Sequence, residues 1–317
     1  MVSVGTGIAR KASQGPEEVA SFMIKILRLL SAASYSRGRP PSPRPRLTPT
    51  GRTRHPTDMP ATPARSRFAT LRLVAILFVA GWLVRSFAVG GMGIHDGAML
   101  PQLRPGDALL VAKWPYGWSR YGLIGGAPLF KGRWWSRDPV RGDVVMIRDV
   151  RPNGSRNVVM RVIGLPGDRV AMRAGTVTLD GRPLPRIRIG DVLIPIRPGT
   201  PCRVVRHEGR ECRYRRFTET MPDGTSHAVF DSAPGPSDDF TARTVPPATL
   251  FLLGDNRDDS IDSRIDPDAG GLGMVPTDRL LGRATILPWS TDRSARLTSP
   301  KSWWTTIQWS RIGLGVD

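Results

Sequence analysis

The chain has 317 residues, and its 46 Lys and Arg against 27 Asp and Glu give a formal net charge of +19. Hydrophobic residues make up 40%, too many for a wholly disordered chain, while 34 glycines and 30 prolines argue against a helical bundle. Two cysteines exclude a multi-cysteine zinc site, and the four histidines form no His-Glu-x-x-His pair. We therefore expect no metal site and no cofactor.

The positive charge is concentrated at the N-terminus. Residues 1–67 hold twelve Lys or Arg and three acidic residues. The densest part, 36–67, is rich in Pro, Ser and Arg and cannot bury a core. A nucleic-acid binder would instead carry its basic patch on a folded surface, with stacking aromatic side chains nearby. The pattern predicts a basic cytoplasmic tail over 1–67 and no nucleic-acid partner.

A single hydrophobic segment follows the tail. Residues 73–84 carry no charge, and the run extends over 68–90 if Arg72 and Arg85 snorkel at its ends. Spanning a bilayer takes about 20 residues, so 68–90 is predicted to be a transmembrane helix. The positive-inside rule keeps the N-terminus in the cytoplasm and places the rest on the other side. Two alternatives stay open: a buried core helix, or a cleaved signal peptide if synthesis starts at Met59.

Beyond residue 91 the sequence is typical of β structure. Short β-branched or leucine-rich runs alternate with turn dipeptides, and Asp180-Gly181 is a strong hairpin signal. The expected strands cover 108–112, 144–147, 158–163, 176–179, 249–253 and 281–287. Residues 182–247 differ, being rich in Arg, Pro and Asp. We expect an antiparallel β core domain over 91–181 and 248–317, with 182–247 as an inserted lobe.

Both cysteines lie in the expected lobe. Cys202 and Cys212 are ten residues apart. If this part of the chain faces the oxidising side of the membrane, a disulfide that closes a short hairpin is expected. Two separate thiols are the alternative.

Four stretches, in chain order, resemble segments of bacterial signal peptidase I, the membrane-anchored serine endopeptidase that removes signal peptides. They are Ile94–Leu103, Arg141–Val145, Met160–Asp168 and Gly254–Arg264. The resemblance covers most of residues 70–317. It implies a mainly β fold: an N-terminal transmembrane helix, then an antiparallel β catalytic-type domain with an inserted smaller β lobe. It also implies a single-pass protein of the bacterial plasma membrane with an extracytoplasmic C-terminal domain, whose partners are the lipid bilayer and signal-peptide segments of preproteins.

The residues that would carry the reaction differ from the family pattern. In the family a serine hydroxyl attacks, a neutral lysine takes its proton, and a backbone N–H and a second serine hydroxyl hold the oxyanion. Here Ala98 matches the nucleophile, Met160 the general base and Asp96 the oxyanion serine. A methyl group cannot form an acyl-enzyme, a thioether cannot carry a proton, and a carboxylate would repel an oxyanion.

The segment that supports the active site matches the family closely. The resemblance implies that its residues hold the fold and buttress the site, with Asp262 and Arg264 forming a pair. They are Asp255, Arg257, Ser260, Asp262, Ser263 and Arg264.

Three hypotheses follow. The first is a catalytically impaired or dead homologue that binds signal peptides by strand addition and regulates export, with an active signal peptidase or the translocation machinery as candidate partners. The second is an endopeptidase that still acts through His95, Asp96 and Asp262, with two carboxylates sharing a proton. The third is a structural, membrane-anchored β module without a peptide ligand.

Overall fold

The computed structural model describes residues 66–122, 132–151, 154–196, 202, 206–207, 211–295 and 299–316. These belong to a unit that runs from Ala64 to Asp317. The expected basic tail falls outside the described residues, except for its last two positions.

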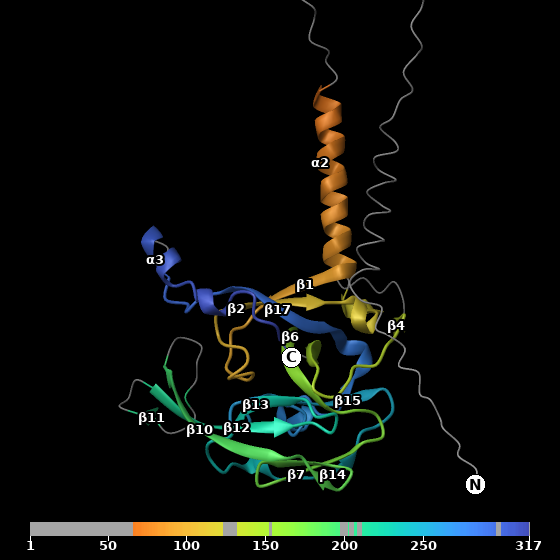
Figure 1. The fold of residues 1–317 in the computed structure, drawn as a ribbon. Helices are drawn as coiled ribbons and strands as arrows, with labels where there is room; N and C mark the ends of the chain where they lie inside the picture. Colours follow the sequence, from red (N-terminus) through yellow and green to blue (C-terminus); the bar gives the residue numbers. More distant parts are fainter. Residues whose placement is uncertain are drawn as a thin grey trace, which may run out of the picture. The chain divides into compact units, whose positions relative to one another are not determined.

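The hydrophobic segment forms a long helix. Helix α2 spans Ser66–Leu83 and continues into a π-helical turn over Val84–Ala88. Residues Ala69–Ala88 are long and apolar enough to cross a membrane, and only 6% of this stretch is buried. Phe78 is 75% exposed. A core helix would be mostly buried, so that alternative is wrong. Figure 1 shows α2 leading directly into the first strand.

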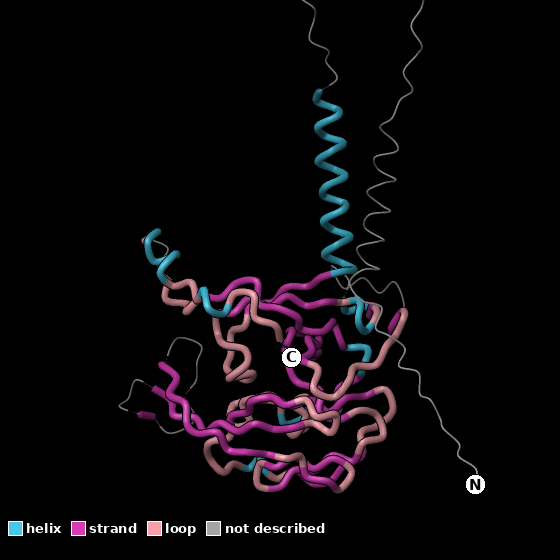
Figure 2. The backbone as a smooth tube through the Cα atoms, viewed as in Figure 1, coloured by secondary structure: helices cyan, strands magenta, loops and turns pink. Residues whose placement is uncertain are grey.

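Strands dominate the rest of the described chain (Figure 2). Their bounds are β1 Val89–Gly93, β2 Asp107–Ala112, β3 Trp118–Ser119, β4 Arg133–Trp134, β5 Val144–Arg151, β6 Gly154–Gly164, β7 Arg169–Arg173, β8 Thr176–Leu179, β9 Arg182–Pro183, β10 Arg186–Pro195, β11 Arg206–His207, β12 Glu211–Thr220, β13 Ser226–Phe230, β14 Phe240–Thr244, β15 Thr249–Leu253, β16 Val275–Pro276 and β17 Leu280–Ser290. A short helix, α3, spans Pro300–Thr305.

The largest sheet has seven strands in the order β1-β2-β17-β5-β6-β15-β16, and all its pairings are antiparallel. The prediction of a helix followed by a mainly β, antiparallel domain is therefore confirmed. Each expected run lies within or overlaps a strand. The Asp180-Gly181 hairpin is also present: both residues have positive φ, and the turn joins β8 to β9.

Both faces of this sheet are buried. Successive side chains of a strand point to opposite faces, so one strand contributes to two apolar clusters. On β5, Val144 and Met146 belong to one apolar cluster, while Val145 and Ile147 belong to another. The second cluster also holds Ala98 and Met160.

Beside the large sheet, the described strands form a two-stranded sheet, β3-β4, and two four-stranded sheets. One joins β10, β11, β12 and β13, and the other has the order β14-β7-β8-β9. The second takes β7 and β8 from before residue 182 and β14 from the expected lobe. It also shares an apolar cluster with Phe251 and Leu253 of β15. This sheet therefore crosses the boundary that composition suggested.

Candidate functional site

The turn that carries Ala98 follows β1 and is fixed at both ends. Backbone bonds join Ile94 to Asp107 and Gly106 to Ile94, with N···O distances of 2.8 and 2.9 Å. Within the turn, the Leu103 N–H donates to the Met99 carbonyl at 2.8 Å. Met99 and Leu103 are buried in the core cluster. Local hydrogen bonds and apolar anchors thus hold Ala98 in one place.

The supporting segment packs directly on this turn. The Asn256 N–H donates to the Ala98 carbonyl at 3.0 Å, and its side-chain amide donates to the Gly97 carbonyl at 3.0 Å. A Cβ on Gly254 would lie 2.6 Å from the Ala98 oxygen and would also clash with the Ser260 hydroxyl. Only glycine lets these two backbones approach so closely.

Met160 lies on β6 in the same apolar cluster as Ala98. Its side chain is 4% exposed, and Ala98 is 8% exposed. The Ser260 hydroxyl is 3.7 Å from the Met160 sulfur, to which it donates. The structure therefore brings together the positions expected to hold nucleophile and base. Neither supplies an oxygen or an amine.

Asp96 alters the hydrogen bonding at the position where the resemblance places an oxyanion. Its side chain is exposed, and its Oδ1 accepts a hydrogen bond from the Ala98 backbone N–H at 3.3 Å. An oxyanion needs an N–H that is free to donate to it. Here an oxygen of the Asp96 carboxyl group already accepts a hydrogen bond from the N–H at the position expected to hold the nucleophile.

Asp262 is fully buried and held by Arg264. The Arg264 guanidinium donates to both carboxylate oxygens, each at 2.9 Å, and the Gly254 N–H donates to Oδ2 at 3.2 Å. Asp262 therefore supports the turn at Gly254.

The other supporting residues also serve the fold. The Ser263 hydroxyl accepts from the Leu252 N–H at 2.9 Å. Asp255 receives two bonds from Arg161, at 2.7 and 2.8 Å, and both side chains are almost fully buried. Arg257 donates to Glu219 on β12.

Two of these partners, Arg161 and Glu219, were not predicted from the sequence. Arg161 follows Met160 within a recognised motif, and alternation along β6 could have placed it on the face opposite to Met160. Glu219 lies in a charged stretch of β12, where no spacing signals a partner 38 residues away. Although burial raises the pKa of Glu219, Arg257 and His227 overcome that effect and lower it below the ordinary value.

Cys202 and Cys212 form a disulfide with their Cα atoms 5.7 Å apart. Cys212, Tyr214 and Phe230 form an apolar cluster with Leu100, two residues beyond Ala98. The β10–β12 hairpin is therefore in contact with the turn that carries Ala98.

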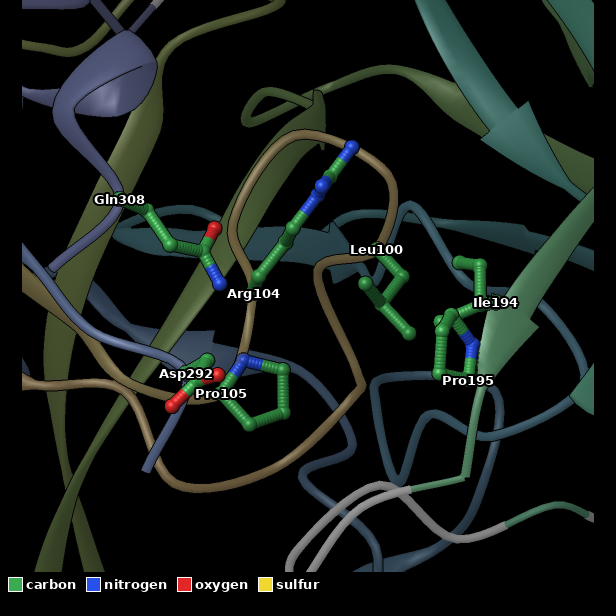
Figure 3. A pocket seen from close by; sticks show the side chains of 7 residues that line it. All are labelled: Leu100, Arg104, Pro105, Ile194, Pro195, Asp292 and Gln308. Atoms are coloured by element: carbon green, nitrogen blue, oxygen red, sulfur yellow. The ribbon is translucent and has the colours of Figure 1, made fainter. Parts of the chain in front are cut away.

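A small cavity of about 90 Å³ lies beside that contact (Figure 3). Figure 3 shows Leu100 facing Ile194 and Pro195, with Arg104 and Gln308 on the other side. Ala98 and Met160 are not among the residues that line it. Among the described residues, no group of three or more His, Cys, Asp or Glu could hold a metal ion.

An apolar helix, an antiparallel β domain, and the packing of the segment after β15 and of Met160 beside the turn that carries Ala98 agree with the arrangement that the resemblance implies. Residues 66–289 match the family model for signal peptidase, peptidase S26. The chain is 31% identical to signal peptidase I of Rickettsia bellii (strain OSU 85-389) over 228 residues, covering 68% of this chain and 71% of that protein. It is 32% identical to signal peptidase I of Rickettsia canadensis over 219 residues, covering 66% and 75%.

A solved signal peptidase I from Enterococcus faecalis V583 is 22% identical and covers 46% of this chain and 97% of that chain, with a TM-score of 0.25. The family model and the Rickettsia relatives are sufficient, and the chain belongs to the signal peptidase I family.

Proposed function

We propose that this protein is a catalytically inactive member of the signal peptidase I family that binds signal-peptide segments at the membrane surface. One observation carries the proposal: Ala98 and Met160 pack in a single apolar cluster at the two positions where the family reaction needs a hydroxyl and an amine. Without a nucleophile and a base, the family's acyl transfer cannot begin.

The hydrogen bond between the Ala98 N–H and Asp96 supports the same conclusion. A substrate carbonyl that entered the site would have to displace a carboxylate from this donor. The second hypothesis, which relies on Asp96 and Asp262 together, loses support because Arg264 neutralises Asp262.

Peptide binding is supported by the edge of β6. Strand β5 pairs with β6 from Gly154 to Arg161, whereas β15 pairs with it only from Arg161 to Gly164. Among the described strands, the stretch 154–160 therefore has a partner on one side only. An extended peptide adds to such an edge through backbone hydrogen bonds. This edge ends at Met160, in the same apolar cluster as Ala98.

The orientation follows from charge. With the basic residues preceding α2 in the cytoplasm, the β domain lies on the extracytoplasmic face, where a disulfide persists. Within that domain we assign 91–181 and 248–317 to the core and 182–247 to an inserted lobe. The partners we propose are signal-peptide segments of preproteins, together with an active signal peptidase or the translocation machinery.

The first test is cleavage. The full chain, purified in detergent, is incubated with a preprotein that carries a small-residue cleavage site, and products are separated on a gel. We expect no product. Cleavage that disappears in Asp96→Asn would refute inactivity.

The second test is binding. A photoreactive amino acid at Asn157, on the open edge of β6, is expected to cross-link to a labelled signal peptide, and unlabelled peptide should compete. The matched control places the same group at Arg173, an exposed residue on β7. Equal cross-linking at both positions, or none at 157, would favour a structural module instead. That second candidate draws support from the burial of both Ala98 and Met160.

A further inference from the structure

A basic cavity lies away from the Ala98 site. It has a volume of about 520 Å³, within the range of small-molecule pockets. Three arginines and one aspartate supply its charge: Arg120, Arg133, Arg279 and Asp278. The hydroxyl-bearing side chains of Tyr121, Ser136 and Thr277 also line it.

No carboxylate of the described residues forms an ion pair with the arginines of this cavity. Among the ion pairs of the described residues, none joins a carboxylate to Arg120, Arg133 or Arg279 within 4.0 Å. Arg133 donates to the backbone carbonyls of Tyr116, Gly117, Thr277 and Leu280. Carbonyls satisfy its N–H groups but do not neutralise its charge.

Two further features of these arginines favour an anion. Burial lowers the pKa of Arg133 to about 10, although Asp278 acts in the opposite direction. The Nε of Arg120 is buried and has no hydrogen-bond partner in the described part of the chain. An anion in the cavity would relieve both conditions.

The cavity lies at the end of the membrane helix. The Lys113 ammonium donates to the Arg85 and Ser86 carbonyls at the end of that helix, at 3.0 and 3.2 Å, and to the Gly122 carbonyl at 2.7 Å. Gly122 belongs to the same short turn as Arg120 and Tyr121. One lysine side chain thus joins the helix end to the wall of the cavity.

Tryptophans provide a second link to the helix. The Trp118 indole donates to the Phe87 carbonyl at 2.6 Å, and Trp118 pairs with Trp134 in the β3–β4 ladder. Trp134 and Trp135 are 59% and 70% exposed. Exposed tryptophans beside a membrane helix are typical of the headgroup region. In Figure 1, β4 lies close to the lower end of α2.

We propose that this cavity binds the phosphate of an anionic phospholipid headgroup. The guanidinium groups of Arg120 and Arg279 contact the phosphate, Arg133 contributes buried positive charge, and Trp134 and Trp135 lie against the adjoining lipid. The site is independent of peptide binding and of the reaction at Ala98.

The test measures lipid binding to the full chain in a neutral detergent by native mass spectrometry. Dioleoyl phosphatidylglycerol, dioleoyl phosphatidylcholine and inorganic phosphate are titrated separately. We expect phosphatidylglycerol to bind at least about tenfold more tightly than phosphatidylcholine, because the choline ammonium cancels the net negative charge of the headgroup and is repelled by the arginines. Inorganic phosphate alone should bind much more weakly than the lipid.

Arg120→Gln/Arg279→Gln should lose this preference. The matched control, Arg173→Gln/Arg182→Gln, removes the same charge from exposed residues on β7 and β9 and should keep it. If the double variant does not fold, as judged by its melting temperature, Arg279→Gln alone should weaken phosphatidylglycerol binding.

Three results would overturn the assignment. They are equal binding of the two lipids by the wild type, equal losses in the double variant and its control, and phosphate binding as tight as that of the lipid.

Discussion

The turn around Ala98 and the segment from Gly254 to Arg264 are in contact, yet they have diverged from the family pattern to different extents. The segment keeps its buried pairs, including Asp262 with Arg264 and Asp255 with Arg161. The turn and the facing strand carry Asp96, Ala98 and Met160 at the positions where our proposal places the lost reactive groups. The comparison indicates that the residues that stabilise the fold and the residues that would react can change independently.

The largest expected effect comes from restoring the reactive atoms. Asp96→Ser/Ala98→Ser/Met160→Lys should cleave a preprotein at least about a thousandfold faster than the wild type, because nucleophile and base together account for most of the rate in such enzymes. The Ser260 hydroxyl, 3.7 Å from the Met160 sulfur, is placed to bond the new amine. Gel analysis of the products measures the gain.

Ala98→Ser alone is the matched control and should stay inactive, since it has no base. A folded triple variant without activity would show that the site has diverged beyond these three positions.

The next largest expected effect is a loss of folding stability when a buried ion pair is broken. Asp255→Asn should lower the free energy of unfolding by about 3–5 kcal/mol, because it leaves the buried Arg161 charge without its carboxylate. Arg188→Gln breaks an exposed, solvent-screened pair with Asp191 and should cost far less. Unfolding in detergent, followed by circular dichroism, compares the two. Equal losses would contradict the distinction between buried and exposed pairs.

A smaller loss of stability is expected at the contact between the turn around Ala98 and the segment from Gly254 to Arg264. Gly254→Ala should cost about 1–3 kcal/mol, since its methyl group meets the Ala98 carbonyl and the Ser260 side chain. Gly235→Ala is the control because no heavy atom lies within 4 Å of its added Cβ. Melting temperatures provide the measurement. A Gly254→Ala protein as stable as the control would mean that the turn can move away from the segment.

The smallest effect is a pH dependence. The folded-state pKa of Glu219 is below its unfolded value near 4.3, so its pair with Arg257 contributes fully above that pH and is lost as the pH falls toward the folded-state pKa. The loss is at most about 1.4 kcal/mol per pH unit for this group. The difference in stability between wild type and Glu219→Gln should therefore be constant above pH 5 and shrink below about 4. A difference unchanged at acid pH would remove Glu219 from the buried network.

The sequence predicted the fold where local signals are strong. An uncharged run of helix-forming length predicts α2, and apolar runs between turn dipeptides predict strands such as β5 and β15. The Asp180-Gly181 turn can be predicted because Asp and Gly adopt positive φ more readily than most residues. The structure shows positive φ at both positions. The close approach of Ala98 and Met160 could be inferred only through the family resemblance, since 62 residues separate them.

Other features depend on tertiary contacts that no local pattern records. Pairing of β14 with β7 joins residues 68 to 75 apart and crosses a boundary that composition suggested. The ion pair between Glu219 and Arg257 likewise forms only when β12 meets the segment that follows β15. The hydrogen bond from the Ala98 N–H to Asp96 depends on the backbone path of a single turn.

The Lys113 ammonium also has a mechanical consequence. With Trp118 it binds three successive carbonyls, those of Arg85, Ser86 and Phe87, where a helix would otherwise fray into solvent. These hydrogen bonds tie the last turn of the apolar helix to β2 and β3, so the helix and the β domain are coupled by side chains as well as by the chain itself.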